Sequence, residues 1–205
     1  YLGTDPQAYM NTGYAKQSNN SDNDWSDLIN LTFVMSNTPP EQYAAALSQV
    51  ANLRQWMTYF ATLTLMEYSE TSLGIGDGDD YSLYSGINDP RFIILGHDFD
   101  TIFAQGDTGG NANQSIFQAA TNPDTPALQK FFSIQDVVPL YYEALYRLAN
   151  TTFTAEELFP LFDRYLSGWV PADRINTMKT FAMNRRAYVL SQIPLSISVT
   201  PTLPL

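Results

Sequence analysis

The sequence contains no cysteine, which excludes disulfide bonds, thiolate catalysis and cysteine-ligated zinc. Histidine is nearly absent as well, since His97 is the only one. Basic residues are scarce: Lys and Arg number 10 against 21 Asp and Glu, which gives a net charge of -11. Such a surface repels phosphate backbones, so we expect no nucleic-acid partner. A nucleotide would need metal ions to offset the like charges at its binding site.

Long apolar runs are also missing, because no stretch reaches the roughly 18 residues that predict a transmembrane helix. We therefore expect no membrane insertion. The chain has 205 residues, of which 44% are hydrophobic and 14% aromatic, a composition typical of one globular domain with a substantial core. The acidic, cysteine-free, Asn/Thr/Ser-rich composition favours an exported bacterial protein, extracellular or on the cell surface.

Apolar periodicity predicts a mainly helical chain. Residues 1–23 are polar and predict an ordered loop or a short helix. Thr38, Pro39, Pro40 and Glu41 match a capping box with proline at the first helical position. The helices are expected at about 24–35, 38–50, 52–68, 126–133, 135–149, 155–166 and 171–191.

Two short strands are predicted at 80–84 and 91–95, on either side of a turn at 86–90. The fold class is thus mainly α with a small β-hairpin. Residues 1–193 are expected to form one domain. The Ser/Thr/Pro-rich stretch 194–205 is expected to be a linker or tail toward a following domain.

Acidic residues cluster before the first strand, where Asp77, Asp79 and Asp80 lie in a glycine-rich loop. Carboxylates this close repel one another unless a cation or hydrogen-bond donors share their charge. Asp98 and Asp100 are expected to end the apolar second strand, and strand alternation predicts that they point the same way. Carboxylate oxygens suit hard cations, so the pattern predicts a site for magnesium, manganese or calcium.

These residues resemble the spore coat CotH kinase-like family. The resemblance rests on the run from Asp79 to Tyr84 and on the run from Arg91 to Asp100, with its His-Asp-Phe-Asp ending. The family pattern is a tyrosine-rich strand, a short turn and a strand ending in Asp, a hydrophobic residue and Asp. The similarity continues in Trp56-Met-Thr-Tyr-Phe60 and reaches about Ile193.

The resemblance implies the C-terminal lobe of an atypical protein-kinase-like fold that transfers phosphate from ATP to Ser or Thr of a protein substrate. It implies magnesium or manganese with ATP as cofactor. Glu70 and Asp98 stand at the catalytic positions, and the nucleotide-binding positions are Asp79, Asp80 and Asp98. The implied metal ligands are Asp98, Asp100, Asp80 and Asp77.

Three departures from the family pattern bear on catalysis. Glu70 stands where many members have a catalytic-loop aspartate, and Asp79-Asp80 replaces a His-Asn pair. The three lysines, Lys16, Lys130 and Lys179, lie outside any strand pattern. We therefore expect that the N-terminal lobe is missing and that this chain alone is inactive.

A non-catalytic reading stays open beside the kinase hypothesis, namely a calcium-binding structural module of a large exported surface protein that uses the same aspartates. For other residues the sequence predicts structural roles: His97 packs or hydrogen-bonds, and Arg91 pairs with an acid such as Asp89. Three tryptophans are expected in the core, namely Trp25, Trp56 and Trp169.

Overall fold

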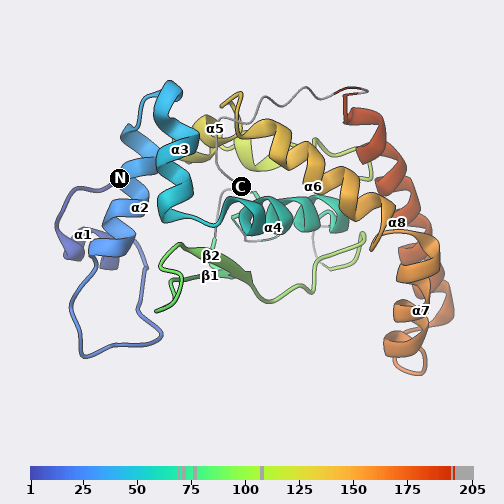
Figure 1. Cartoon of the computed structure of the whole chain (residues 1–205). Coiled ribbons are helices and arrows are strands. Elements are labelled where there is room, and N and C mark those ends of the chain that lie inside the picture. The colour runs from blue at the N-terminus through green and yellow to red at the C-terminus, as the bar shows by residue number, and fades with distance from the viewer. Residues whose placement is uncertain (69, 71–72, 76–77, 107–108, 195, 197–205) are drawn as a thin grey trace.

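A computed structural model describes residues 1–68, 70, 73–75, 78–106, 109–194 and 196 of the chain. This part is mainly helical and carries a two-stranded antiparallel hairpin, as predicted (Figure 1). The elements are α1 (Pro6–Met10), α2 (Ser26–Asn37), α3 (Pro40–Val50), α4 (Leu53–Met66), β1 (Tyr81–Tyr84), β2 (Ile93–Gly96), the 3-10 helix η1 (Gln118–Ala120), α5 (Pro126–Phe131), α6 (Val138–Asn150), α7 (Ala155–Leu166) and α8 (Ala172–Gln192).

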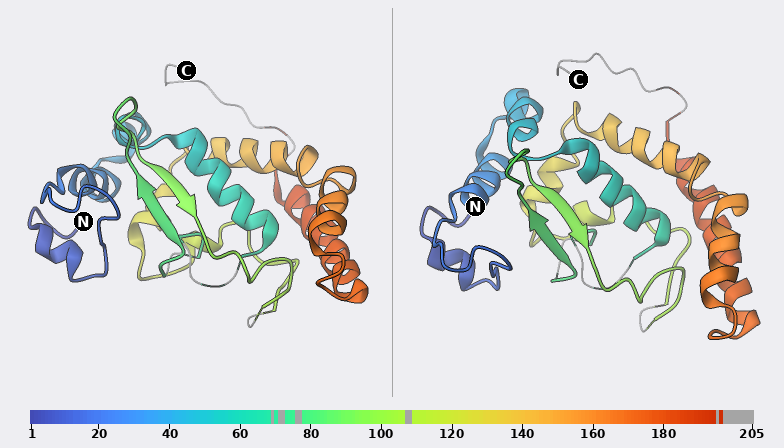
Figure 2. Two further views of the ribbon diagram at one scale, coloured as in Figure 1. Left: turned by 90° about the horizontal axis from the view of Figure 1, so that it is seen from below. Right: turned by 60° about the horizontal axis from the view of Figure 1, so that its bottom comes forward.

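Helix α4 lies at the centre, with α6 on one side and the hairpin on the other (Figures 1 and 2). It begins after Asn52, whose side chain accepts a hydrogen bond from the backbone N–H of Gln55 at 3.2 Å and so caps the helix. Eight of its fourteen residues are buried. A helix covered on several sides needs apolar residues around most of its circumference, which explains this composition.

Aromatic rings join α4 to its neighbours in the core. Phe132 lies at the centre of the group: its ring centroid is 5.1 Å from that of Phe60, 4.9 Å from that of Phe131 and 5.1 Å from that of Tyr141. The ring planes are steeply inclined, the edge-to-face arrangement that aromatic quadrupoles favour. This cluster connects α4, α5 and α6.

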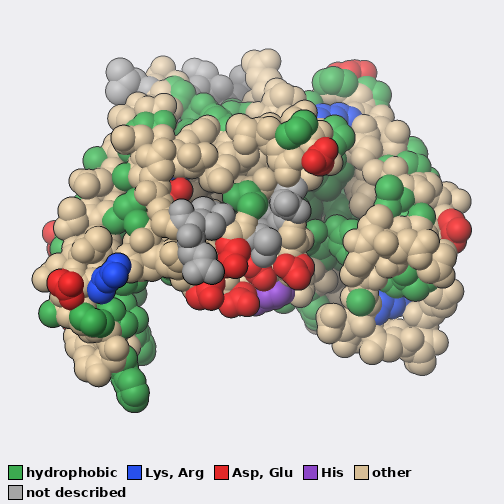
Figure 3. Space-filling model, turned by 180° about the vertical axis from the view of Figure 1, so that it is seen from behind, with side chains coloured by type: hydrophobic (Ala, Val, Ile, Leu, Met, Phe, Trp, Pro, Cys, Tyr) green, Lys and Arg blue, Asp and Glu red, His purple; other side chains and the backbone are tan. Residues whose placement is uncertain are grey.

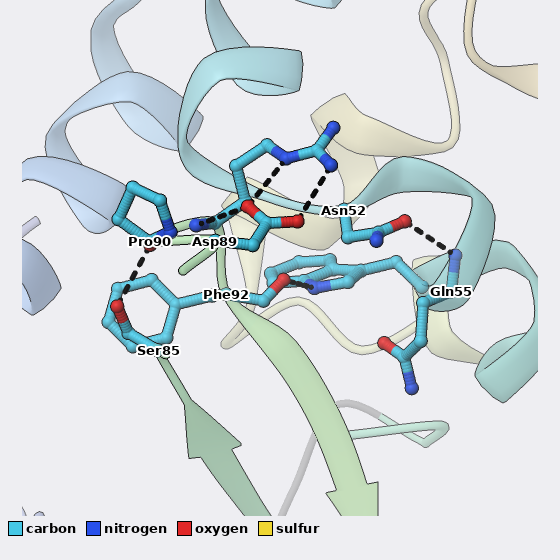
Figure 4. A network of polar contacts seen from close by, with 8 residues as sticks. Asn52, Gln55, Ser85, Asp89, Pro90 and Phe92 are labelled. Carbon is cyan, nitrogen blue, oxygen red and sulfur yellow. Dashed lines mark hydrogen bonds and ion pairs between the residues drawn. The ribbon is translucent and has the colours of Figure 1, made fainter. Parts of the chain in front are cut away.

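The hairpin is fixed to the start of α4 by hydrogen bonds rather than by packing alone (Figure 4). The indole N–H of Trp56 and the backbone N–H of Asn52 both donate to the carbonyl of Phe92, at 2.8 and 3.0 Å. The side chain of Gln55 donates to the carbonyl of Ile94 at 2.6 Å and accepts from the N–H of the same residue at 2.9 Å. Strand β2 therefore runs along α4 in a fixed register, which determines where the strand ends.

Most helix boundaries agree with the predictions, but two local expectations are wrong. Thr38 does not cap α3: it lies just after α2, and its backbone N–H donates to the carbonyl of Val34 at 3.3 Å. The capping position of α3 is Pro39, which has no side-chain donor or acceptor. Trp169 is 89% exposed in the turn between α7 and α8, so it is not a core residue, whereas Trp25 and Trp56 are buried.

Among the described residues, none of the helices combines the length and the apolar composition that a membrane span needs.

Candidate functional site

Four of the predicted site residues lie near the end of α4, the start of β1 and the end of β2. We call Glu70, Asp80, Asp98 and Asp100 the acidic edge. Figure 3 shows acidic side chains gathered on one face of the molecule, beside its only histidine. The attachment of β2 to α4 brings the start of β1 and the end of β2 to this place, because Tyr81 pairs with Gly96 in the hairpin.

Asp80 is the buried member of the acidic edge, with 8% of its surface exposed. Its carboxylate accepts a short hydrogen bond from the hydroxyl of Tyr68, the second residue after α4. Its backbone carbonyl accepts a hydrogen bond from the N–H of His97 at 3.1 Å, one step beyond the last strand pair. Asp80 is therefore held through both its main chain and its side chain.

Asp98 and Asp100 do not share a strand face, so the prediction from strand alternation is wrong. Strand β2 ends at Gly96, and Asp98 has φ of 55° in the left-handed region. A carbon at the Cβ position of Gly96 would collide with the ring of Phe99, which folds back over the strand end. Both aspartates lie at the surface.

Glu70 and Asp100 contact each other through a hydrogen bond between their carboxyl groups, which raises the pKa of Glu70. The hydroxyl of Thr101 donates to Oε2 of Glu70 at 3.1 Å. Two carboxyl groups in contact cannot both ionise without repulsion, so one proton or a cation between them is favourable. The Arg91–Asp89 and Lys179–Asp163 ion pairs both lie outside the acidic edge.

The backbone around the acidic edge is strained. Of the described residues other than glycine, five have positive φ. Four of them flank this site: Glu67, Asp98, Phe103 and Ala104, with φ between 52° and 61°. Such conformations cost free energy and persist where the surroundings enforce them, often at functional sites. At these four residues the backbone conformation is therefore set by the surrounding structure rather than by the preference of the residue itself.

Buried charges lie directly behind the acidic edge. Glu67 is 4% exposed, and its Oε2 has no hydrogen-bond partner within the described part of the chain. Burial raises the pKa of Glu67, and a backbone hydrogen bond from Asn111 and the nearby guanidinium of Arg185 oppose this. Arg185, from α8, is 1% exposed and donates to the carbonyls of Thr64, Ala112 and Gln114. It thus ties α8 to the end of α4.

Not every predicted ligand enters this arrangement. Asp77 lies outside the described residues, and Asp79 is exposed next to Asp80. His97 is exposed as well, so its predicted packing role is not observed, although its backbone takes part in the hairpin. Arg91 pairs with Asp89 as predicted. Within the described residues, no group of three or more His, Asp or Glu side chains is arranged to hold a metal ion.

The oxygen donors that are present are of the type that magnesium uses. Magnesium is commonly held by one or two carboxylates, with water and substrate phosphates completing its shell. The Glu70 and Asp100 carboxyl groups already touch, and Asp80 is close enough for its charge to raise the pKa of Glu70. These carboxylates are therefore oxygen donors of the kind that hard cations prefer.

Tyr68, Glu67 and Arg185 were missed at the sequence level as parts of the site. Tyr68 and Glu67 end an apolar helical run, where a tyrosine predicts core packing and a glutamate predicts a solvated helix end. Arg185 lies 121 residues from its partner Thr64, so no local pattern could connect them. The one available signal was the position of Tyr68 directly before the acidic loop.

The model of the family described as CotH kinase protein matches residues 1–188 of the chain. No curated protein matches the sequence.

Proposed function

The chain belongs to the CotH kinase protein family, and on this basis we propose that it acts in phosphoryl transfer from ATP to a Ser or Thr hydroxyl of a protein. In this reaction the bond between the γ-phosphorus and the β,γ-bridging oxygen breaks. A new bond forms between the γ-phosphorus and the hydroxyl oxygen, and the hydroxyl proton passes to a base. We further propose that the helices and the hairpin correspond to the C-terminal lobe of a kinase-like fold in an exported protein.

The observation that carries the proposal is that the family match covers the segment that holds Asp80 at the start of β1 and Asp98 and Asp100 beyond the end of β2. Phosphoryl transfer depends mainly on positioning and on neutralising phosphate charge, so carboxylates placed to hold magnesium are the component this chemistry needs most. The strained backbone supports this assignment, because it holds Asp98 in a conformation that a plain strand would not adopt.

Each residue of the acidic edge would have a separate task. Asp98 and Asp100, both exposed, would bind magnesium or manganese, which when bound offsets the charge of the nucleotide phosphates. Asp80, buried and hydrogen-bonded, would orient the cation from behind together with Asp79. Glu70 would take the hydroxyl proton once it is deprotonated. Its contact with Asp100 raises its pKa and so makes it a better proton acceptor when ionised.

Thermal unfolding with and without ligands tests this function. Magnesium or manganese together with ATP is expected to raise the melting temperature, since a ligand at about 100 times its Kd stabilises the native state by about 2.7 kcal/mol. Asp98→Ala should abolish the shift and lower the melting temperature of the ligand-free protein only slightly, because the side chain is exposed and alanine is less suited than aspartate to the left-handed backbone there. Asp89→Ala is the matched control, since it removes an exposed carboxylate at the opposite end of the same hairpin.

Phosphate transfer itself is measured with radiolabelled ATP and dephosphorylated casein, with Asp98→Ala as the inactive reference. Because this chain alone is expected to be inactive, the same measurements are made on a longer protein that also carries the upstream lobe. Stabilisation by calcium alone, with no further effect of ATP and no transfer by that longer protein, would contradict the kinase proposal. That result would support the calcium-binding structural module instead.

A further inference from the structure

Tyr68 connects the two halves of the acidic edge, although phosphoryl transfer as described above assigns it no task. It is 2% exposed and follows Glu67, whose left-handed backbone ends α4. Its own backbone N–H donates to the carbonyl of Leu63 at 3.0 Å, which fixes the start of its side chain on the helix end. The ring therefore leaves α4 in a direction set by the helix cap rather than by the loop that follows.

The hydroxyl of Tyr68 lies between the start of β1 and the end of β2. It donates to the carboxylate of Asp80 in a short hydrogen bond, and it lies 3.2 Å from the backbone carbonyl of Asp98. A phenol has one proton, and the charged carboxylate is the stronger acceptor. The hydroxyl of Tyr68 thus fixes the side chain of Asp80 and lies next to the main chain of Asp98.

The ring of Tyr68 adds a second contact to the same turn. It meets the ring of Phe99 edge to face, with centroids 5.6 Å apart and planes at 89°. Phe99 can take this position because residue 96 is glycine, as a side chain there would occupy the space of its ring. Tyr68 therefore contacts this turn at two neighbouring residues, with its hydroxyl next to the carbonyl of Asp98 and its ring against Phe99.

We infer that Tyr68 is a positioning residue for the cation site: it sets the orientation of the Asp80 carboxylate relative to Asp98. This inference rests on the proposed function, because it concerns the same site. Groups that orient metal ligands without touching the metal typically change metal affinity by about 10-fold to 100-fold when they are removed. Tyr68→Phe removes the hydroxyl and leaves the ring contact with Phe99 in place.

Manganese alone is the probe, and its Kd is measured by titration at a temperature well below unfolding. Tyr68→Phe is expected to raise the Kd about 10-fold or more relative to the unaltered chain. Tyr43→Phe is the matched control, because Tyr43 is also a buried tyrosine but lies in α3, and its hydroxyl has no hydrogen-bond partner in the described structure. Its Kd should stay within about twofold of the unaltered value.

A second readout needs no cation. The N–H of His97 donates to the carbonyl of Asp80, so loosening of Asp80 should speed hydrogen exchange at this amide in Tyr68→Phe and leave it unchanged in Tyr43→Phe. If Tyr68→Phe does not fold, Phe99→Leu tests the ring contact instead, since Phe99 is 38% exposed and its loss is tolerable. A smaller rise in the manganese Kd, about threefold, is expected there.

The outcomes separate the inference from the function beneath it. Manganese binding by the unaltered chain with an unchanged Kd in Tyr68→Phe would overturn the positioning role and leave the proposed function standing. An equal rise in Tyr43→Phe would also overturn it, since the effect would then be general loosening. Absence of manganese binding by the unaltered chain, with or without ATP, would remove both.

Discussion

In the aromatic core, neutral rings from α4, α5 and α6 pack edge to face, whereas at the acidic edge carboxyl groups touch each other across a strained turn. The core uses residues in regular helices with ordinary backbone conformations. The edge uses left-handed residues and contacts between like charges. Interactions of the first kind stabilise the native state, and those of the second kind cost stability. The aromatic core thus stabilises the fold, and the acidic edge carries the residues proposed for the chemistry.

Glu67 and Arg185 lie on the border between these regions. Arg185 reaches from α8 across the core side to the carbonyl of Thr64 near the end of α4, while Glu67 ends the same helix. A carbon at the Cβ position of Gly110 would come within 2.7 Å of Oε2 of Glu67, so the loop 109–114 closes over the carboxyl group. Glu67 and Arg185 thus connect the strained backbone of the acidic edge to the packed helices of the core.

The largest effect is expected from Phe131→Ala in the core. Phe131 is fully buried between Phe60, Phe132 and Trp56, so truncation leaves a cavity and should lower the free energy of unfolding by about 3–5 kcal/mol. Urea unfolding measures the loss, and manganese titration of the folded fraction should give an unchanged Kd. Phe33→Ala, at an exposed phenylalanine of α2, is the control and should cost much less.

A large change in the manganese Kd of Phe131→Ala would contradict the separation between the aromatic core and the acidic edge, because the core would then affect cation binding.

The core was the predictable region. The helix over 155–166 was predicted with the bounds that the structure gives, and 38–50 and 52–68 differ from α3 and α4 by at most two residues at each end. Apolar periodicity carries this information because buried helix faces repeat every 3.6 residues. Proline at the first turn of α3 added a clear start, although Thr38 itself turned out to end the preceding helix.

The acidic edge was predictable in composition and not in shape. The clustering of Asp79, Asp80, Asp98 and Asp100 was visible in the sequence, but the strand ends at Gly96, so alternation along it does not reach Asp98. The turn depends on Phe99 folding back over Gly96, and the orientation of Asp80 depends on a tyrosine from another element. Such contacts arise from tertiary packing, which no local pattern encodes.

Glu67→Gln is expected to raise the free energy of unfolding, by less than Phe131→Ala lowers it. Burial raises the pKa of Glu67 above its ordinary value of 4.5. Between these two pKa values the native state keeps a proton that the unfolded chain loses, so stability falls as the pH rises through this window. Glutamine cannot ionise and avoids this loss. We expect a gain of about 1 kcal/mol at pH 7, the scale for a poorly satisfied buried polar group, and little gain at pH 4.

Urea unfolding at the two pH values measures this difference, with Glu143→Gln on the exposed side of α6 as the control. A loss of stability at pH 7 would mean that the attraction between Glu67 and Arg185 outweighs the cost of burying the charge. The two residues would then stabilise the native state, as the aromatic core does.

The smallest change in stability is expected from Asp100→Asn at the acidic edge itself. The hydrogen-bonded contact with Asp100 is the main cause that raises the pKa of Glu70, so the amide should return this pKa toward its ordinary value. A carboxyl group with a raised native pKa weakens the native state above that pKa, and the variant should therefore be slightly more stable at neutral pH, with the gain lost on acidification. The pKa of Glu70 is followed by NMR titration of its side-chain carbonyl carbon.

Manganese affinity should fall in the same variant, because a negative oxygen donor is replaced by a neutral amide. Greater stability together with weaker cation binding would show that Asp100 is retained at the expense of the fold, whereas a destabilised variant with unchanged affinity would place this aspartate among the structural residues.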